Sequence, residues 1–401
     1  MSRRHRASWT FLFITVFVDM LGYGMVIPLL PFFVQAQLPG ALVVGLLASL
    51  YALMQFFSVP LLGSLSDRYG RRPLLLVCLL GTGLAYLLLG LAQTIGLLVV
   101  AVLLDSATGG SQAVAQAYVA DNTPPAERAR GMGGLGAAFG LGLLLGPALG
   151  GLLSGYGLHV PAFAAALLAL SNAAVGWVRL PESLLPERRH FAWPANWFNP
   201  LVPLGQALRL PGLRPLLLAT FLLNLAFAGL YTNFPLFSQA RFGWDAFDNG
   251  LFFAFVGVCA VLTQGVLLGR LQPWLGEKRL VAGGLGLTAL LLALLALAPA
   301  AWMLYPVMGL LALGTGLAIP AITSLISQAA PAHGQGQVLG GTNALLSLAM
   351  LVAPTMAGLL FDLLSTGAPY WAGSLLAAAA LFVGRPVLRQ PARRDYGKGP
   401  V

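Results

Sequence analysis

The sequence predicts an all-α polytopic membrane protein with twelve transmembrane helices, arranged as two pseudo-symmetric six-helix bundles. Hydrophobic residues make up 58% of the 401 residues and charged residues only 8%, whereas a soluble domain carries roughly a quarter charged residues. The apolar residues form runs close to the length of about 20 residues that spans a bilayer. Similar segments recur at an offset of 206 or 207 residues, which indicates two homologous halves.

The apolar runs are separated by glycine, proline and clusters of charge. We predict spans at residues 9–35, 43–66, 74–94, 96–120, 131–155, 160–179, 213–238, 247–269, 280–299, 301–328, 338–362 and 369–387. The first run follows a basic start but is long and contains Asp19. We therefore interpret it as a span and not as a cleaved signal peptide.

The basic residues predict the orientation of the chain. The net charge is +10, but these residues lie in short connections between apolar runs, so we expect a lipid bilayer and not nucleic acid as the partner. Of the 22 basic residues, only Arg241 falls on the side opposite the N-terminus. This bias predicts a multi-pass protein of the cell membrane, a bacterial inner membrane, with both termini in the cytoplasm.

The longest hydrophilic connection divides the chain near its middle. We predict an N-terminal six-helix bundle over residues 1–180, a cytoplasmic linker with an amphipathic stretch over 181–212, a C-terminal six-helix bundle over 213–390 and a cytoplasmic tail over 391–401. Transporters built from such repeats bind substrate at the repeat interface near the middle of the membrane.

The connection after the second span is the most specific motif. Residues 63–72 read GSLSDRYGRR. Gly63 is expected to let helices pack closely, and Gly70 to permit a tight turn. Asp67 and the arginines are expected to form a charge cluster at the cytoplasmic mouth. Ordinary positive-inside loop charge is the alternative, but it does not account for the glycines and Asp67.

This connection resembles the signature of the major facilitator superfamily, G-x-L-a-D-R-x-G-R-R/K, and the resemblance extends over the whole chain. In that family the loop aspartate and arginines form a gate latch that breaks and reforms during alternating access. The resemblance implies this role for Gly63, Asp67, Arg68, Gly70, Arg71 and Arg72. Asp121 and Arg128 are expected to join the gate, although solvated loop charge explains them nearly as well. Pro273 replaces the aspartate in the second half, so that copy is expected to lack the latch.

The fifth span carries small residues at regular spacing. Its motif consists of Gly133, Gly142, Gly146, Pro147, Gly150 and Gly151. Such glycines leave a groove in which another helix can touch the backbone, and the proline is expected to kink the helix. Generic small-residue packing is the alternative. The pattern resembles the antiporter motif of the drug/proton exporters of the superfamily.

The first span contains an acidic residue, Asp19, about ten residues from its start. That position is roughly 15 Å along a helix and near the midplane, where a charge is costly and points to function. Burial disfavours the charged carboxylate, so Asp19 could carry a proton near neutral pH. A structural carboxyl group bonded to a neighbouring helix is the alternative. The surrounding residues resemble the equivalent span of tetracycline exporters, which has an acidic residue here.

The fourth span departs from the exporters of this group. They usually carry an arginine early in this span, and Val102 stands at that place. Asp105 follows one turn later, before Ser106-Ala107-Thr108-Gly109-Gly110, as in one branch of the tetracycline-exporter-like proteins. Asp105 is a candidate second proton site or a ligand for a cationic substrate. A structural hydrogen-bonding role is an equally good interpretation.

Polar residues in the spans are candidates for lining a central cavity. They are Gln55, Gln112, Gln116, Asn224, Tyr231, Asn233, Gln264 and Asn343. Polar groups in a membrane normally turn toward the bundle interior whatever their purpose, so each alone is weak evidence. No catalytic triad, nucleotide-binding loop, metal-ligand cluster or cofactor motif is present in the sequence, so an enzyme is not expected and an ion gradient is the expected source of energy.

Together these features predict a monomeric secondary transporter, a proton-coupled antiporter that exports amphiphilic, drug-like molecules resembling tetracycline by alternating access. Its expected partners are a small-molecule substrate, protons and the lipid bilayer. A proton-coupled symporter or a uniporter of a sugar or other small solute is one alternative, disfavoured by the motif in the fifth span. A non-transporting membrane receptor or scaffold is another. The buried carboxylates and the gate motif disfavour it.

Overall fold

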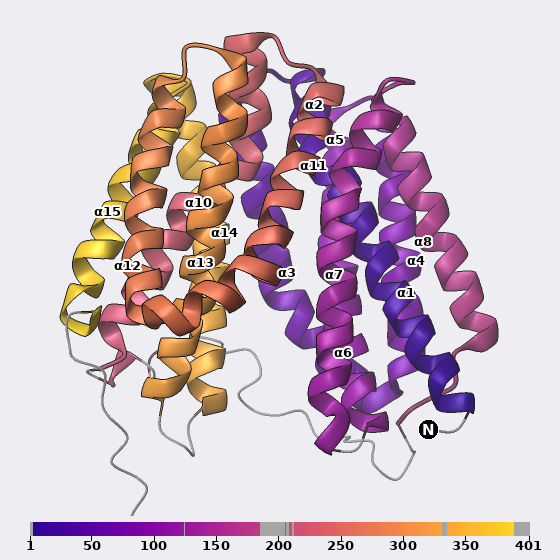
Figure 1. The fold of residues 1–401 in the computed structure, drawn as a ribbon. Helices are drawn as coiled ribbons and strands as arrows, with labels where there is room; N and C mark the ends of the chain where they lie inside the picture. The colour runs from indigo at the N-terminus through magenta and orange to yellow at the C-terminus, as the bar shows by residue number, and fades with distance from the viewer. Residues whose placement is uncertain are drawn as a thin grey trace, which may run out of the picture.

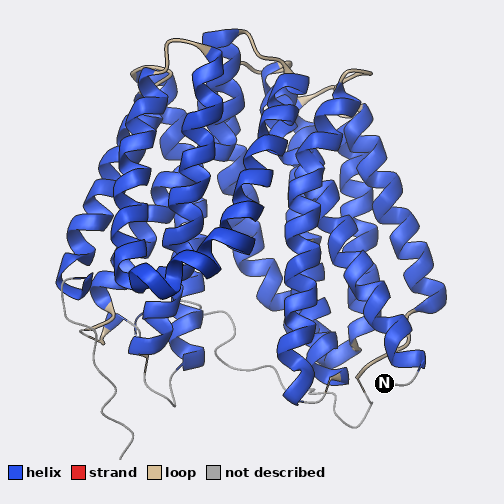
Figure 2. Cartoon of the chain, viewed as in Figure 1, coloured by secondary structure: helices blue, strands red, loops and turns tan. Residues whose placement is uncertain are grey.

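The computed structural model describes residues 3–123, 125–184, 205, 208–210, 212–330 and 335–388. These residues form helices joined by short connections (Figure 2). The first half contains α1 (Arg3–Val26), η1 (Ile27–Leu29), α2 (Leu30–Gln35), α3 (Ala41–Tyr69), α4 (Arg71–Gly90), α5 (Ile95–Thr108), α6 (Ser111–Asn122), α7 (Pro125–Ser154) and α8 (Val160–Arg179). Most of the predicted linker and the predicted tail lie outside the described residues, so the predicted domain boundaries stay predictions.

The second half repeats this arrangement. It contains α10 (Arg214–Phe242), α11 (Ala246–Leu262), the π-helical turn η3 (Thr263–Leu267), α12 (Leu268–Leu297), η4 (Ala301–Met303), α13 (Leu304–Ala329), α14 (Gln335–Leu363) and α15 (Ala368–Leu388). Figure 1 shows the later helices, in orange and yellow, beside the earlier ones in indigo and magenta.

The number of spans in the described residues agrees with the predicted twelve. Ten helices are long and apolar enough to cross a membrane, and α10, which is bent by 47°, brings the number to 11. One of these helices is the continuous segment Ala246–Leu297 of 52 residues. It would be about 78 Å long, more than twice the thickness of a bilayer core. Gly276 interrupts it with φ 72° and ψ 160°, so this segment forms two spans, as predicted.

Two predicted spans are less regular than expected. The fourth span is broken between α5 and α6 because Gly109 and Gly110 leave the helical conformation. The first span tightens into η1 at Pro28 before continuing as α2. By contrast, Pro147 lies inside α7, which runs without interruption from Pro125 to Ser154.

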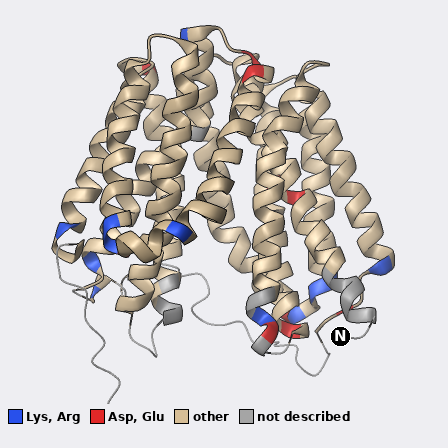
Figure 3. Cartoon of the chain, in the orientation of Figure 1, with Lys and Arg blue, Asp and Glu red and all other residues tan. Residues whose placement is uncertain are grey.

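Charge defines two sides of the described helices. Lysine and arginine gather at one end of the bundles, which we call the basic side (Figure 3). It includes the α3–α4 connection and the turn around Gly276. The opposite end, the far side, carries Arg241 and the acidic residues Asp245, Asp248 and Asp362 at the ends of α10, α11 and α14.

The most extensive contacts between the two bundles are those of α3 with α14 and of α7 with α11, and α10 also touches α2 and α3. Toward the far side these helices are almost in backbone contact. A Cβ atom added at Gly45 would lie 2.3 Å from the carbonyl oxygen of Pro354, and one at Gly151 would lie 2.6 Å from the Cα of Gly250. Only glycine fits such crossings, because any side chain would push the helices apart.

Toward the basic side, no described residue covers the same faces of α3 and α7. Gly63 is five helical turns beyond Gly45 on α3, and Gly133 is five turns before Gly151 on α7, so each shares a face with the glycine at the crossing. Among the described residues, no atom lies within 4 Å of a Cβ added at Gly63 or Gly133. The close packing predicted for Gly63 is therefore absent here, because α14 diverges from α3. In Figure 1 the lower part of α11 likewise runs away from α7.

Candidate functional site

The two membrane carboxylates lie close together in the N-terminal bundle. Asp19 on α1 accepts a hydrogen bond from the Ser111 hydroxyl, at the point where the chain restarts as α6 after the Gly109–Gly110 break. Asp105 on α5 is 9% exposed, while Asp19 is partly exposed. The two carboxylates are near enough to interact electrostatically. The sequence predicted both residues as candidates, but not that the broken span brings them together.

Hydroxyl groups surround Asp105. Its carboxylate interacts with the hydroxyls of Thr82 on α4 and Tyr51 on α3. The amide nitrogen of Gln55 donates to the Tyr51 hydroxyl over 3.0 Å, so this predicted polar residue belongs to the same network. The ring of Tyr51 lies 6.2 Å from that of Tyr23 on α1. Thr82 and Tyr51 were not among the predicted site residues, because their role depends on how α3 and α4 dock.

No basic side chain of the described residues neutralises the pair from within the membrane core. Val102, at the position where the resemblance leads one to expect an arginine, is buried in an apolar cluster that includes residues of α3 and α4, the helices that pack against α5. The described arginines and lysines lie at helix ends or around the turn at Gly276. Within the described part of the chain, the carboxylates are therefore held by hydroxyl donors alone, a weaker compensation for buried charge than an ion pair with hydrogen bonds.

The glycine motif of α7 packs closely against the backbone of α1, the helix that carries Asp19. A Cβ at Gly142 would lie 2.6 Å from the carbonyl oxygen of Phe17, and one at Gly146 would lie 2.6 Å from the Cα of Gly24. Gly150 meets the carbonyl oxygen of Met25 in the same way, at 2.5 Å. The expected groove therefore exists and accommodates α1.

Two residues of that motif do not contribute to the groove. Gly151 faces α11 of the other bundle, and Gly133 contacts nothing within 4 Å among the described residues. The motif thus joins the helix of Asp19 on one face and the bundle interface on the other.

Arg71 is the centre of the predicted gate cluster. Its guanidinium lies 2.5 Å from the carboxylate of Asp67 and 2.9 Å from that of Asp121, and it donates to the Ser66 hydroxyl over 2.6 Å. Arg71 is buried although it begins a helix at the membrane edge. Gly70, at φ 108°, provides the predicted tight turn.

The other predicted gate residues lie around this centre. Arg68 stacks over the ring of Tyr69, with 5.3 Å between the guanidinium carbon and the ring centroid. Arg72 donates to the carbonyl oxygen of Trp177 over 2.5 Å. Arg128 donates to the carbonyl oxygen of Thr123 over 3.2 Å. The structure therefore groups Asp67, Arg71 and Asp121, and shows backbone or ring contacts for Arg68, Arg72 and Arg128.

Two glutamates that sequence reasoning missed stabilise the corresponding turns in each half. Glu182 accepts hydrogen bonds from the backbone N–H groups of Arg71 and Arg72, over 2.9 and 3.2 Å, and so caps α4. In the second half, Glu277 follows Gly276 and accepts from Ser324 and Gln328 of α13, over 2.6 and 2.8 Å. Glu277 stands where Arg71 stands in the first repeat. The second copy has Pro273 in place of the aspartate, and there the negatively charged Glu277 forms hydrogen bonds to α13, whereas Arg71 forms ion pairs in the first copy.

The predicted cavity-lining residues fall into different environments. Gln112 and Asn224 are partly exposed, while Gln116, Gln264 and Asn343 are exposed. Gln264 lies in the π-helical turn η3, a feature often found at functional sites. The side chain of Tyr231 lies outside the described residues.

Asn233 does not line a cavity. It is 1% exposed and its amide nitrogen donates to the carbonyl oxygen of Gly229 in its own helix. Packing of α10 against its neighbours buries it.

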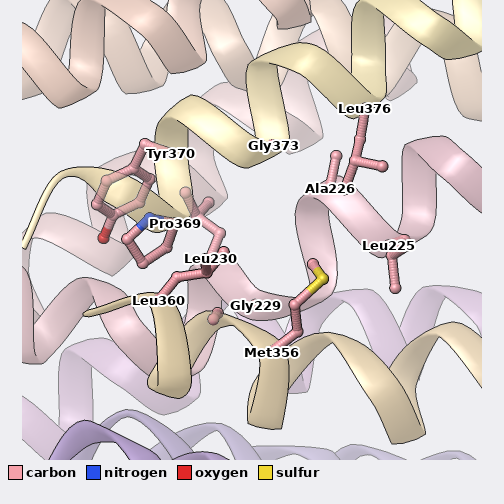
Figure 4. A pocket seen from close by; sticks show the side chains of 11 residues that line it. Leu225, Ala226, Gly229, Leu230, Met356, Leu360, Pro369, Tyr370, Gly373 and Leu376 are labelled. Atoms are coloured by element: carbon pink, nitrogen blue, oxygen red, sulfur yellow. The ribbon is translucent and has the colours of Figure 1, made fainter. Parts of the chain in front are cut away.

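A small apolar recess lies elsewhere, between α10, α14 and α15 (Figure 4). Leu230, Met356, Leu360 and Tyr370 are among the residues that line it. None of the predicted site residues does so. The recess therefore is not part of the carboxylate site.

Comparisons with known proteins agree with this architecture. The family model of the Major Facilitator Superfamily matches residues 12–349 and 268–401. The class C tetracycline resistance protein of Escherichia coli is 35% identical over 383 residues, covering 94% of this chain and 95% of that protein. Multidrug resistance protein 2 of Bacillus subtilis is 30% identical over 351 residues, covering 87% of each chain.

A solved structure also matches the fold. The human organic anion transporter MFSD10 (TETRAN) is 26% identical and superposes with a TM-score of 0.71, covering 96% of this chain and 100% of that one. The family model and the relatives each extend over most of the chain and describe transporters, not enzymes. The protein belongs to the major facilitator superfamily of membrane transporters.

Proposed function

We propose that this protein is a proton-coupled antiporter that exports amphiphilic, drug-like molecules resembling tetracycline. The observation that carries the proposal is the pair of Asp19 and Asp105, held in the membrane by hydroxyl groups with no basic partner among the described residues. An unneutralised carboxylate in a membrane marks an ion or substrate pathway by default. Relatives named as tetracycline and multidrug resistance proteins support the substrate class.

The proposed cycle follows from charge. With the far side facing outside, a carboxyl group of the pair takes up a proton there, becomes neutral and releases a bound substrate. The protonated protein returns to the conformation open toward the basic side. Loss of the proton to the cytoplasm restores the negative charge, so the site can bind another substrate. Competition between proton and substrate, direct or through conformation, couples the two fluxes.

The arrangement of α1 supports a link between the carboxylates and the bundle interface. Gly142, Gly146 and Gly150 of α7 hold the segment of α1 on either side of Asp19, while Gly151 holds α11. If a change of charge at Asp19 shifts α1, the shift would therefore pass through α7 and alter the packing at the α7–α11 crossing. Packed interfaces respond to small shifts by switching between arrangements.

The orientation is part of the proposal. The described lysines and arginines gather at the basic side, and basic connections face the cytoplasm in membrane proteins. We infer that both termini are cytoplasmic, in a bacterial inner membrane, and that the monomer is the working unit. The gate of Asp67, Arg71 and Asp121 then lies at the cytoplasmic mouth.

Transport in proteoliposomes tests the proposal. Tetracycline or a hydrophobic cation is supplied against an imposed pH gradient, with the parent, Asp19→Asn and Asp105→Asn compared at equal amounts of folded protein. We expect gradient-driven accumulation by the parent and its loss in at least one variant. Asp248→Asn, on the far side, is the control and should retain transport. Accumulation that ignores the pH gradient, or parental transport in both variants, would contradict the proposal.

A further inference from the structure

An acidic residue outside the carboxylate site joins the two bundles. Asp362 lies near the end of α14, and its carboxylate accepts hydrogen bonds from the backbone N–H groups of Ala41 and Leu42, over 3.0 and 2.8 Å. These groups belong to the first turn of α3, in the other bundle. The N-cap residue of α3, Gly40, offers no side chain of its own. Asp362 therefore supplies from the C-terminal bundle the cap that α3 lacks.

The contact is well placed to hold the bundles together. A carboxylate at a helix N-terminus gains both from hydrogen bonds to free N–H groups and from the helix dipole. Farther along the same crossing, Gly358 approaches the carbonyl oxygen of Ala41. The Thr355 hydroxyl donates to the Ser49 hydroxyl over 2.7 Å. The cap thus lies at the far-side end of the α3–α14 crossing, beside these neutral contacts.

The other acidic side chains of the described residues have their hydrogen-bond and ion-pair partners within one bundle. Asp245 and Asp248 cap α11 from within its own bundle. The carboxylates of Asp67 and Asp121 bind Arg71 inside the N-terminal bundle. Asp362 differs from these because its bonds must break whenever α3 and α14 separate at the far side.

We propose that Asp362 is a positioning residue that holds the far side closed while the basic side is open. Its two hydrogen bonds form in this conformation and are lost in the opposite one, so they bias the equilibrium between the two. The proposal rests on the alternating access proposed above, but not on proton coupling or on the substrate.

The distance between the far-side ends of the bundles tests this. Spin labels are attached at Tyr156→Cys, after α7, and at Trp302→Cys, before α13, with Cys78 and Cys259 replaced by alanine. Tyr156 is 83% exposed and Trp302 70% exposed, so the labels should not disturb packing. Distances are measured without substrate or gradient in the parent, Asp362→Ala, Asp362→Asn and the control Asp248→Ala.

We expect a predominantly short distance in the parent and in Asp248→Ala. Asp362→Ala should raise the ratio of long to short distances on the order of tenfold, as the loss of hydrogen bonds to a charged group implies. Asp362→Asn keeps one acceptor oxygen and should fall between them, and it replaces the alanine variant if that one fails to fold. The same distribution in the parent and both Asp362 variants would overturn the proposal. Because no gradient is applied, this result is independent of whether transport is proton-coupled.

Discussion

At the scale of single residues, the acidic side chains of the described segments fall into groups with different partners. Asp19 and Asp105 interact with hydroxyl groups inside a bundle. Asp67 and Asp121 bind a buried arginine. A third group accepts hydrogen bonds from backbone N–H groups at helix N-termini, where a carboxylate complements the helix dipole. Its members are Glu182, Asp245, Asp248 and Asp362. Only the first group is suited to exchanging a proton or binding a cation within the membrane.

Glu182 gives a prediction for the third group. Its Oε1 accepts from the N–H of Arg71 and its Oε2 from that of Arg72, so Glu182→Ala leaves the first turn of α4 uncapped. Loss of such a cap costs about 1 kcal/mol. We expect a lower midpoint of thermal unfolding in detergent for Glu182→Ala than for the parent. Glu127→Ala, which removes an exposed glutamate from the first turn of α7, is the control. Equal midpoints for the two variants would argue against a capping role.

The residue scale also shows where sequence reasoning ends. The tight turn at Gly70 was predictable because glycine, without a Cβ, adopts positive φ readily, and Gly70 lies in a short connection between two apolar runs. The caps by Glu182 and Asp362 were not. Asp362 and Leu42 are separated by 320 positions in the sequence. No local sequence pattern marks such a pair. These contacts depend on how helices dock, which composition and periodicity do not specify.

At the scale of helices, α7 contains two sets of glycines with different surroundings. Gly142, Gly146 and Gly150 touch the backbone of α1, whereas Gly136 and Gly140 have nothing within 4 Å among the described residues. The sequence predicted a groove along the helix but not its extent. The groove is confined to the half of α7 that crosses α1 and α11.

This difference yields a prediction within one helix. A methyl group at Gly146 would lie 2.6 Å from the Cα of Gly24, and overpacking of this kind typically costs about 1–3 kcal/mol. Gly146→Ala should therefore lower the unfolding midpoint and reduce transport, as measured by thermal melts and by substrate uptake into vesicles. Gly140→Ala should leave both unchanged or raise the midpoint slightly, because alanine favours the helix. Similar effects of both substitutions would show that close contact between the backbones of α1 and α7 does not require glycine at Gly146.

At the scale of the whole molecule, the twelve-helix architecture and its internal repeat followed from the sequence, because span length and repetition are properties of the chain itself. The conformation did not, because span length and repetition do not specify which ends of the two bundles are in contact. The bundles touch at the far side, and no described residue covers the glycine faces at the basic side, so this conformation is closed at the far side. Gly63 and Gly133 thus lie on faces that would meet their partners only when the basic side closes.

A bulky residue at Gly63 should consequently block that closure. Gly63→Leu places a side chain on the face of α3 that continues from Gly45, where nothing lies within 4 Å among the described residues. We expect transport to fall strongly while the unfolding midpoint changes little. Gly96→Leu also fills open space, but at the exposed start of α5, and should keep transport. Equal transport in the two variants would contradict the assigned closure.

The direction of proton movement during substrate efflux distinguishes antiport from symport and uniport. Vesicles are loaded with substrate, no pH gradient is imposed, and the internal pH is recorded while the substrate leaves down its own gradient through the protein. Proton-coupled antiport predicts that protons enter as substrate leaves, so the interior becomes more acidic, and that Asp19→Asn or Asp105→Asn abolishes the change. Protons leaving with the substrate would indicate symport. Substrate efflux with no change in internal pH would indicate a uniporter, and either result would rule out proton-coupled antiport.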